Sequence, residues 1–86
     1  MTRVPGTVAL RAALAEQIRR ARKKCALSQE ELAWRSALHR TYISMIERSQ
    51  RSPTVDSLEK IAAALGISVS ALLARAEKSR ARNKPR

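Results

Sequence analysis

The sequence predicts an all-α protein built from five short helices. Apolar residues recur at spacings of three and four along most of the chain, as on one face of a helix, and no segment alternates in the manner of a strand. Helix boundaries are also marked. Ser28 and Glu31 form an S-x-x-E capping box at the start of one helix, and Gly66 supplies a left-handed stop at the end of another.

We expect one small domain, because 86 residues suffice for a single hydrophobic core and little more. Pro5 and Gly6 precede the first helical pattern, so residues 1–8 are predicted to be a flexible leader. Residues 77–86 are basic and nearly free of apolar side chains, which predicts a disordered tail. The folded domain should therefore span residues 9–76.

The first predicted helix starts at Val8 and should bury one apolar face, made of Leu10, Leu14, Ile18, Ala21 and Cys25. A second helix follows Ser28, with Leu32 and Ala33 inward, and a third follows a break at residues 36–38.

The fourth helix is predicted within TVDSLEKIAAALG, with Thr54 as its N-cap. Its inward face should contain Val55, Leu58, Ile61, Ala62 and Leu65. Ser68 is expected to cap the fifth helix, whose apolar residues are Val69, Leu72 and Leu73.

The charge of the chain predicts a polyanionic partner. Eighteen Lys and Arg against seven Asp and Glu give a formal net charge of +11, which favours nucleic acid first and an acidic membrane surface second. With one Trp, one Tyr and no Phe, the chain has too few rings for a stacking platform on single-stranded nucleic acid. A membrane-surface peptide would need one long basic amphipathic helix. The helix stops argue against it, so no membrane partner is expected.

The composition also argues against an enzyme. The sequence contains no carboxylate pair, metal cluster, nucleophile–base set or phosphate loop, and no cofactor is expected. Cys25 is the only cysteine, so we interpret it as a small buried apolar residue. No apolar run is long enough to span a bilayer, and the N-terminus lacks the apolar stretch of a secretory signal. We therefore expect a cytoplasmic, nucleoid-associated protein.

The stretch HRTYISMIER, residues 39–48, predicts a helix with two unlike faces. One face should carry Arg40, Thr41, Ser44, Met45 and Arg48. The opposite face should carry Tyr42, Ile43 and Ile46, with Glu47 beside them. A buried back and a polar front indicate a helix that presents its front to a ligand.

A helix, a short break and this amphipathic helix have the layout of a helix-turn-helix. The segments LSQEELA, YISMIE and LEKIAAALG together resemble the phage-repressor-like, Cro-type helix-turn-helix family, also called the xenobiotic-response-element family. The resemblance runs from about Leu14 to Leu73, with the motif at about residues 29–48. Within the family, HRTYIS is most similar to the controller proteins of restriction–modification systems. The resemblance implies a five-helix, lambda-repressor-like domain and a transcription regulator.

The resemblance also implies roles for single residues on double-stranded DNA. The recognition helix, His39–Glu47, should enter the major groove. Base contacts are expected from Arg40, Thr41, Ser44 and Met45, with Arg40 on a guanine and Thr41 or Met45 on a thymine methyl. Phosphate contacts are expected from Gln29, Arg35, Tyr42, Arg48 and Arg51. For each arginine, an exposed cation that only keeps the protein soluble is the alternative.

Two structural features follow from the same resemblance. Arg22 and Glu47 match a pair that forms a salt bridge between the first helix and the end of the recognition helix. Ala26, Ala37 and Ser49 stand where family members often have glycine. If these three positions need positive φ, each adds about 1 kcal/mol of strain.

One recognition helix reads only a few base pairs, so the resemblance implies a homodimer on a palindromic operator. Its interface is expected to use Val69, Leu72 and Leu73, unless these residues simply close the core. An alternative function is a protein-interaction module: an antitoxin that binds a toxin, or a coactivator that binds transcription machinery such as RNA polymerase. Trp34, which helical phase places outward, would then contact the partner; otherwise it should lie flat over neighbouring side chains.

Overall fold

The computed structural model describes residues 7–82, and over this range the chain is all-α, as predicted. It forms five helices: α1 (Thr7–Lys24), α2 (Gln29–Ser36), α3 (Arg40–Glu47), α4 (Val55–Leu65) and α5 (Val69–Arg82). Residues 1–6 of the predicted leader and residues 83–86 of the predicted tail lie outside the described residues, but residues 7 and 8 belong to α1, so the leader was predicted two residues too long.

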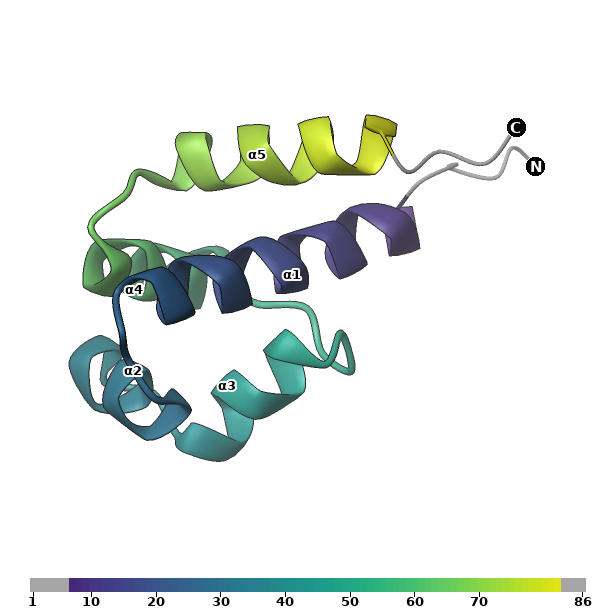
Figure 1. The fold of residues 1–86 in the computed structure, drawn as a ribbon. Coiled ribbons are helices and arrows are strands. Elements are labelled where there is room, and N and C mark those ends of the chain that lie inside the picture. Colours follow the sequence, from purple (N-terminus) through teal and green to yellow (C-terminus); the bar gives the residue numbers. More distant parts are fainter. Residues whose placement is uncertain (1–6, 83–86) are drawn as a thin grey trace.

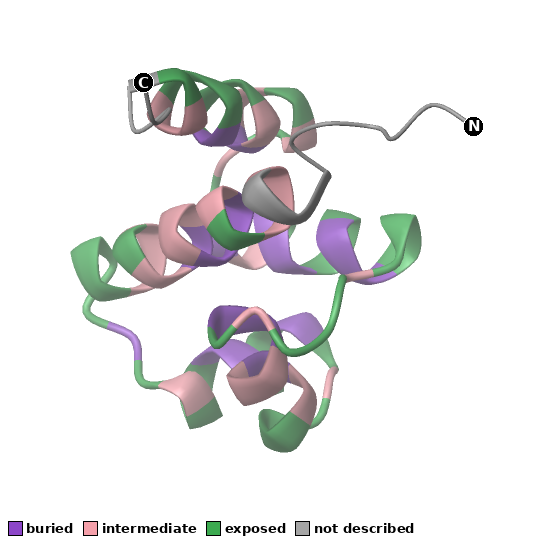
Figure 2. Ribbon diagram, turned by 90° about the vertical axis from the view of Figure 1, so that its right-hand side faces the viewer, coloured by how far each residue is buried: buried purple, intermediate pink, exposed green. Residues whose placement is uncertain are grey.

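Helix α1 lies in the middle of the molecule (Figure 1). Helix α5 packs on α1 and α4 on one side, while α3 packs on α1 and α2 on the other. The start of α1 and the end of α5 lie at the same end of the molecule (Figure 1). Buried residues line the inner faces of the helices and exposed residues the outer faces (Figure 2). The α2–α3 pair therefore forms a surface remote from α5.

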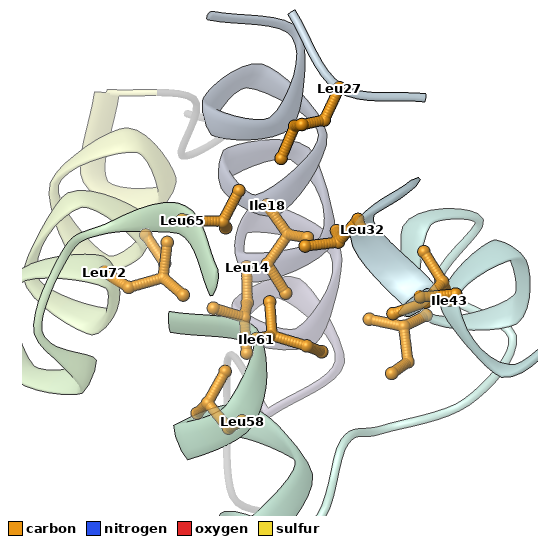
Figure 3. Packing of buried hydrophobic residues seen from close by; sticks show 12 residues of the cluster. Leu14, Ile18, Leu27, Leu32, Ile43, Leu58, Ile61, Leu65 and Leu72 are labelled. Atoms are coloured by element: carbon orange, nitrogen blue, oxygen red, sulfur yellow. The ribbon is translucent and has the colours of Figure 1, made fainter. Parts of the chain in front are cut away.

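Every helix contributes to one hydrophobic core. The six largest fully buried side chains are Ile18, Leu32, Ile43, Ile46, Ile61 and Leu72. Figure 3 shows Ile18 and Leu14 of α1 between the side chains of α4 and α5 and those of α2 and α3. Burying such side chains contributes roughly 1.5–3 kcal/mol each. This core fixes α3 against α1 and α2.

The predicted helix starts are present. The Ser28 hydroxyl accepts a hydrogen bond from the Glu31 N–H at 3.0 Å, and the Glu31 carboxylate accepts one from the Ser28 N–H at 2.9 Å. Thr54 caps α4 by accepting the Ser57 N–H, and Ser68 caps α5 by accepting the Ala71 N–H. Each cap satisfies a backbone donor that the first helical turn leaves free.

Four helix ends share one turn geometry. The residue after each turn donates its N–H five positions back: Leu27 to Arg22, Leu38 to Ala33, Gln50 to Met45 and Ile67 to Ala62. The residue before each donor has φ between 58° and 73°, namely Ala26, Ala37, Ser49 and Gly66. This is the Schellman arrangement, which needs a left-handed residue. The three non-glycine positions therefore do adopt the strained conformation.

Helix α3 begins at Arg40, one residue later than predicted, and His39 is its N-cap with extended φ and ψ of −73° and 143°. The His39 side chain makes no capping hydrogen bond. N-caps prefer a short side chain with an oxygen acceptor, which an imidazole lacks. The recognition helix is therefore Arg40–Glu47.

Helix α5 extends to Arg82, so the prediction of a disordered tail from residue 77 is wrong for residues 77–82. Ala76 is fully buried and continues the apolar stripe begun by Leu72. Helix α1, which starts at Thr7, supplies the surface on which this extra length packs. The tail composition was a poor guide because residues 77–82 continue the helix that Leu72 and Ala76 anchor in the core, although several of their own side chains stay exposed.

Two predicted core residues are exposed. Cys25 follows the last residue of α1 and is exposed, because the turn at Ala26 redirects the chain and Leu27 takes the buried place. Val55, the first residue of α4, is 75% exposed. Its helical phase is that of the buried face, but at the first turn no described residue covers it.

Candidate nucleic-acid interface

The interface begins with the close packing of α2 and α3. Ala33 is buried where the two helices meet, and its methyl group allows their close approach. Ile43 and Ile46 are buried on the back of α3. A larger residue at 33 would overpack this contact. The orientation of α3 is thus set by its apolar back.

The front of α3 carries the four residues predicted to contact bases. Arg40 and Thr41 are exposed, while Ser44 and Met45 are partly exposed. Within residues 7–82, Arg40 makes no hydrogen bond or ion pair. Its guanidinium, with five donors in a planar fork, is therefore available to an external acceptor.

Glu47 joins three helices at the end of α3. Its carboxylate accepts hydrogen bonds from Arg22 Nε at 2.7 Å and Arg22 Nη2 at 2.9 Å. Arg22 Nη1 also donates to the Leu27 carbonyl at 2.9 Å. The Glu47 carboxylate is nearly fully buried, and this bidentate geometry satisfies its charge. The structure thus contains the ion pair that the sequence predicts.

Gln29, the first residue of α2, is part of the same network. Its Nε2 donates to Glu47 Oε1 at 3.1 Å, and the side chain is partly exposed. The second hydrogen of the Gln29 amide is available to another acceptor. Backbone N–H groups in the first turn of a helix favour a bound anion, so an anion at the start of α2 could accept this hydrogen too. A phosphate contact by Gln29 would thus be tied to the position of α3.

Tyr42 is engaged inside the protein. Its hydroxyl lies 2.9 Å from Ser57 Oγ and accepts the Thr54 N–H at 3.3 Å. The Arg51 guanidinium lies over its ring, 5.3 Å from the centroid. Partial burial raises the pKa of Tyr42, but its hydrogen bonds to Ser57 and Thr54 and the nearby Arg51 outweigh burial, so the pKa lies below the ordinary value. No local pattern reveals the Ser57 contact, because fifteen residues separate the partners.

The other cations predicted to contact phosphate lie on the surface. Arg35 and Arg48 are exposed, and Arg48 Nε donates a long hydrogen bond of 3.4 Å to the Ser44 carbonyl. Arg35 lines a shallow hollow on α2 with Glu30, Glu31 and Trp34. Trp34 is 85% exposed, so the expectation that it lies flat over neighbouring side chains is wrong.

The residues predicted to form a dimer interface divide into two groups. Leu72 is fully buried in the core and is not available to a partner, which corrects the prediction for that residue. Val69 and Leu73 are partly buried against the core and keep some exposed surface. Helical geometry explains the difference, because Leu72 faces α1 while its neighbours lie at the edges of that face.

Other site types are not found among the described residues. Within residues 7–82, no group of three or more His, Cys, Asp and Glu side chains could hold a metal ion. Over the same range, no single helix is long and apolar enough to cross a bilayer; α4 and α5 qualify only as a pair, bent by 96° at the break between them.

Comparison with known proteins identifies the family. The helix-turn-helix family pattern matches residues 18–72. Control protein C.BamHI of Bacillus amyloliquefaciens is 45% identical over 65 residues, which are 74% of this chain and 80% of the relative. Control protein C.SmaI of Serratia marcescens is 50% identical over 62 residues, 72% of this chain and 74% of the relative.

Solved structures agree with this result. The restriction–modification controller protein C.AhdI of Aeromonas hydrophila superposes with a TM-score of 0.70 at 35% identity, covering 72% of this chain and 94% of that chain. The matched residues include α2, α3 and the core that holds them. The chain belongs to the helix-turn-helix family and is a DNA-binding transcription regulator rather than an enzyme.

Proposed function

We propose that the protein binds a specific palindromic operator in double-stranded DNA as a homodimer, with α3 in the major groove. The exposed face of α3 carries this proposal, because Arg40 lies on it without a partner among residues 7–82, while Ile43 and Ile46 anchor its back. The net charge of +11 supports a polyanionic ligand. Similarity to control proteins favours a controller role in a restriction–modification system, in the cytoplasm at the nucleoid.

Each surface residue takes a distinct role in this proposal. Arg40 reads a guanine through O6 and N7, and Thr41 and Met45 contact thymine methyl groups, with Ser44 as a further base contact. Phosphate contacts come from four residues: Gln29, Arg35, Arg48 and Arg51. The hydroxyl of Tyr42 was predicted to be a fifth, but its bonds inside the protein favour an indirect role.

A dimer supplies the specificity that one helix lacks. Two recognition helices related by a two-fold axis would read half-sites about one helical turn, roughly 34–36 Å, apart. Val69 and Leu73 are the residues of the predicted interface that remain accessible. Bound at a promoter, such a dimer either blocks polymerase or recruits it.

The test is selection of bound sequences from a random DNA pool, first with the wild type and then with Arg40→Ala. The wild type should enrich a palindrome, and Arg40→Ala should lose preference at one position per half-site, worth about 1–3 kcal/mol. Lys23→Ala, which removes an exposed cation of α1, is the matched control and should leave the selected sequence unchanged. A wild-type pool without enrichment would refute sequence-specific binding.

A second function, binding of a partner protein such as a toxin or RNA polymerase, is favoured by Trp34. An indole that is 85% exposed beside Glu30 and Glu31 is unusual, and Trp is common in protein interfaces. Trp34→Ala should then keep operator affinity but lose partner capture or transcription activation. Unchanged fluorescence of Trp34 on adding the partner would count against this function.

A further inference from the structure

Arg51 is held in place although it lies in a loop. The loop between α3 and α4 carries this exposed cation, and its guanidinium lies 5.3 Å from the centre of the Tyr42 ring. Within residues 7–82 no carboxylate forms an ion pair with it. The ring face is the feature that orients this arginine, by a cation–π contact.

The Tyr42 ring is itself fixed by a closed hydrogen-bond network. Ser57 Oγ donates its one hydrogen to the Thr54 carbonyl at 3.0 Å and accepts the Thr54 hydroxyl at 3.0 Å. The Tyr42 hydroxyl lies 2.9 Å from Ser57 Oγ and accepts the Thr54 N–H at 3.3 Å. The phenol oxygen thus has two hydrogen-bond partners at the start of α4.

This network links the recognition helix to the loop. Tyr42 belongs to α3 and follows Thr41, so its ring keeps a constant position relative to the exposed front of that helix. Ser57 and Thr54 belong to the start of α4, and Ser57 is buried. The ring therefore lies between two elements that the core already holds, and Arg51 rests on its face.

We propose that Tyr42 is a positioning residue: its ring holds the Arg51 guanidinium where it contacts a DNA phosphate beside α3, and its hydroxyl fixes the ring to the start of α4. This inference rests on the proposed function. An arginine oriented in advance loses less side-chain freedom on binding than a free one. A cation–π contact at an exposed site corresponds to about a two- to fivefold effect on affinity.

A double-mutant cycle on the full chain tests the coupling, with the selected operator and an unrelated duplex as ligands. Arg51→Gln should weaken binding to both duplexes alike and lower the slope of log affinity against log salt by about one charge. Tyr42→Leu should weaken binding about two- to fivefold. In the Arg51→Gln background, Tyr42→Leu should have little further effect. Tyr42→Phe, which keeps the ring, should keep most of the affinity while lowering the melting temperature.

Arg48→Gln is the matched control, because Arg48 is also exposed and has no aromatic contact with any residue of the described range. Its effect should add to that of Tyr42→Leu. A readout without DNA guards against misfolded variants: ring-current shifts of the Arg51 Cδ protons should be present in the wild type and in Tyr42→Phe, and absent in Tyr42→Leu.

Two results would overturn the inference while leaving the proposed function intact. One is full additivity of the effects of Tyr42→Leu and Arg51→Gln on DNA affinity, when the wild type itself binds its operator. The other is a loss in Tyr42→Phe as large as in Tyr42→Leu while the Arg51 ring-current shifts persist, which would mean that the hydroxyl and not the ring face supports DNA binding. A wild type that binds no duplex would refute the proposed function as well.

Discussion

The Glu47 carboxylate and the Arg22 guanidinium form a bidentate ion pair, with N–O distances of 2.7 and 2.9 Å, that joins the end of α3 to α1. The side chains are only 2% and 11% exposed. An isolated buried charge is costly, so each partner depends on the other. The pair therefore controls both the stability of the domain and the orientation of the recognition helix.

Glu47→Ala should lower the free energy of unfolding by about 3 kcal/mol, because it leaves the Arg22 guanidinium buried and unpaired. It should also weaken DNA binding, since α3 loses its link to α1. Urea unfolding and a binding titration measure the two effects. Glu16→Ala is the control: it removes the exposed pairs with Arg19 and Arg20 and should change stability by less than about 1 kcal/mol. Equal melting of Glu47→Ala and wild type would show the bridge to be unimportant.

The three strained turns should be improved by glycine. Ala26→Gly, Ala37→Gly and Ser49→Gly should each raise the free energy of unfolding by up to about 1 kcal/mol, because φ near 58° is unfavourable for a residue with a Cβ. Thermal unfolding measures the gain. Ala63→Gly, in the exposed interior of α4, should instead lose about 1 kcal/mol. Destabilisation by all three turn substitutions would contradict the strain argument.

The opposite change tests the remaining turn. At Gly66, with φ of 73°, a Cβ would meet nothing within 4 Å, so Gly66→Ala isolates the backbone effect. It should lower the free energy of unfolding by about 1 kcal/mol. A loss well above that would indicate a contact of Gly66 beyond its backbone conformation.

The capping box should make part of the stability depend on pH. The Ser28 backbone N–H, followed by the Ser28 side chain, holds the pKa of Glu31 below its ordinary value of 4.5. Because the folded pKa is the lower one, this stabilisation is fully present above about pH 4.5 and is lost as the pH falls through the folded pKa. Glu31→Gln should therefore melt below wild type at neutral pH, and the difference should shrink in acid. A pH-independent difference would be inconsistent with this origin.

The dimer is testable in solution. Sedimentation at micromolar concentration should show a species of twice the 9.6 kDa chain mass. Leu73→Ala should shift it toward monomer, because Leu73 keeps exposed surface, whereas Leu72→Ala should chiefly lower stability, by about 3 kcal/mol, because Leu72 is fully buried. Only 9.6 kDa species in the wild type would exclude the dimer at that concentration.

Local signals predicted most of the fold. Ser28 with Glu31, Thr54 and Gly66 mark helix boundaries that depend on neighbours within a few residues, and the structure contains all of them. The errors arise where tertiary packing decides. Val55 has the phase of a core residue, but no residue in the described part of the chain covers it, and α5 continues past Ala76 beside α1.

For the candidate site, too, local signals predicted some features and tertiary contacts decided the others. The front of α3 follows from helical period alone, and Arg40 is exposed as expected. The bond between Tyr42 and Ser57 joins residues on different helices, so no spacing in the sequence indicates it. The Arg51 guanidinium lies over the ring of a residue nine positions earlier, and no periodic pattern in the sequence indicates that contact either.

Because α1 begins at the end of the molecule where α5 ends, we expect the helices to pack in the same way when they are connected in a different order. A short linker from Arg82 to Thr7, with new termini opened near Ser52 in the loop after α3, should preserve all five helices. Such a circular permutant would place both new ends beside the recognition surface, where a fused nuclease or fluorophore could act directly on the bound duplex.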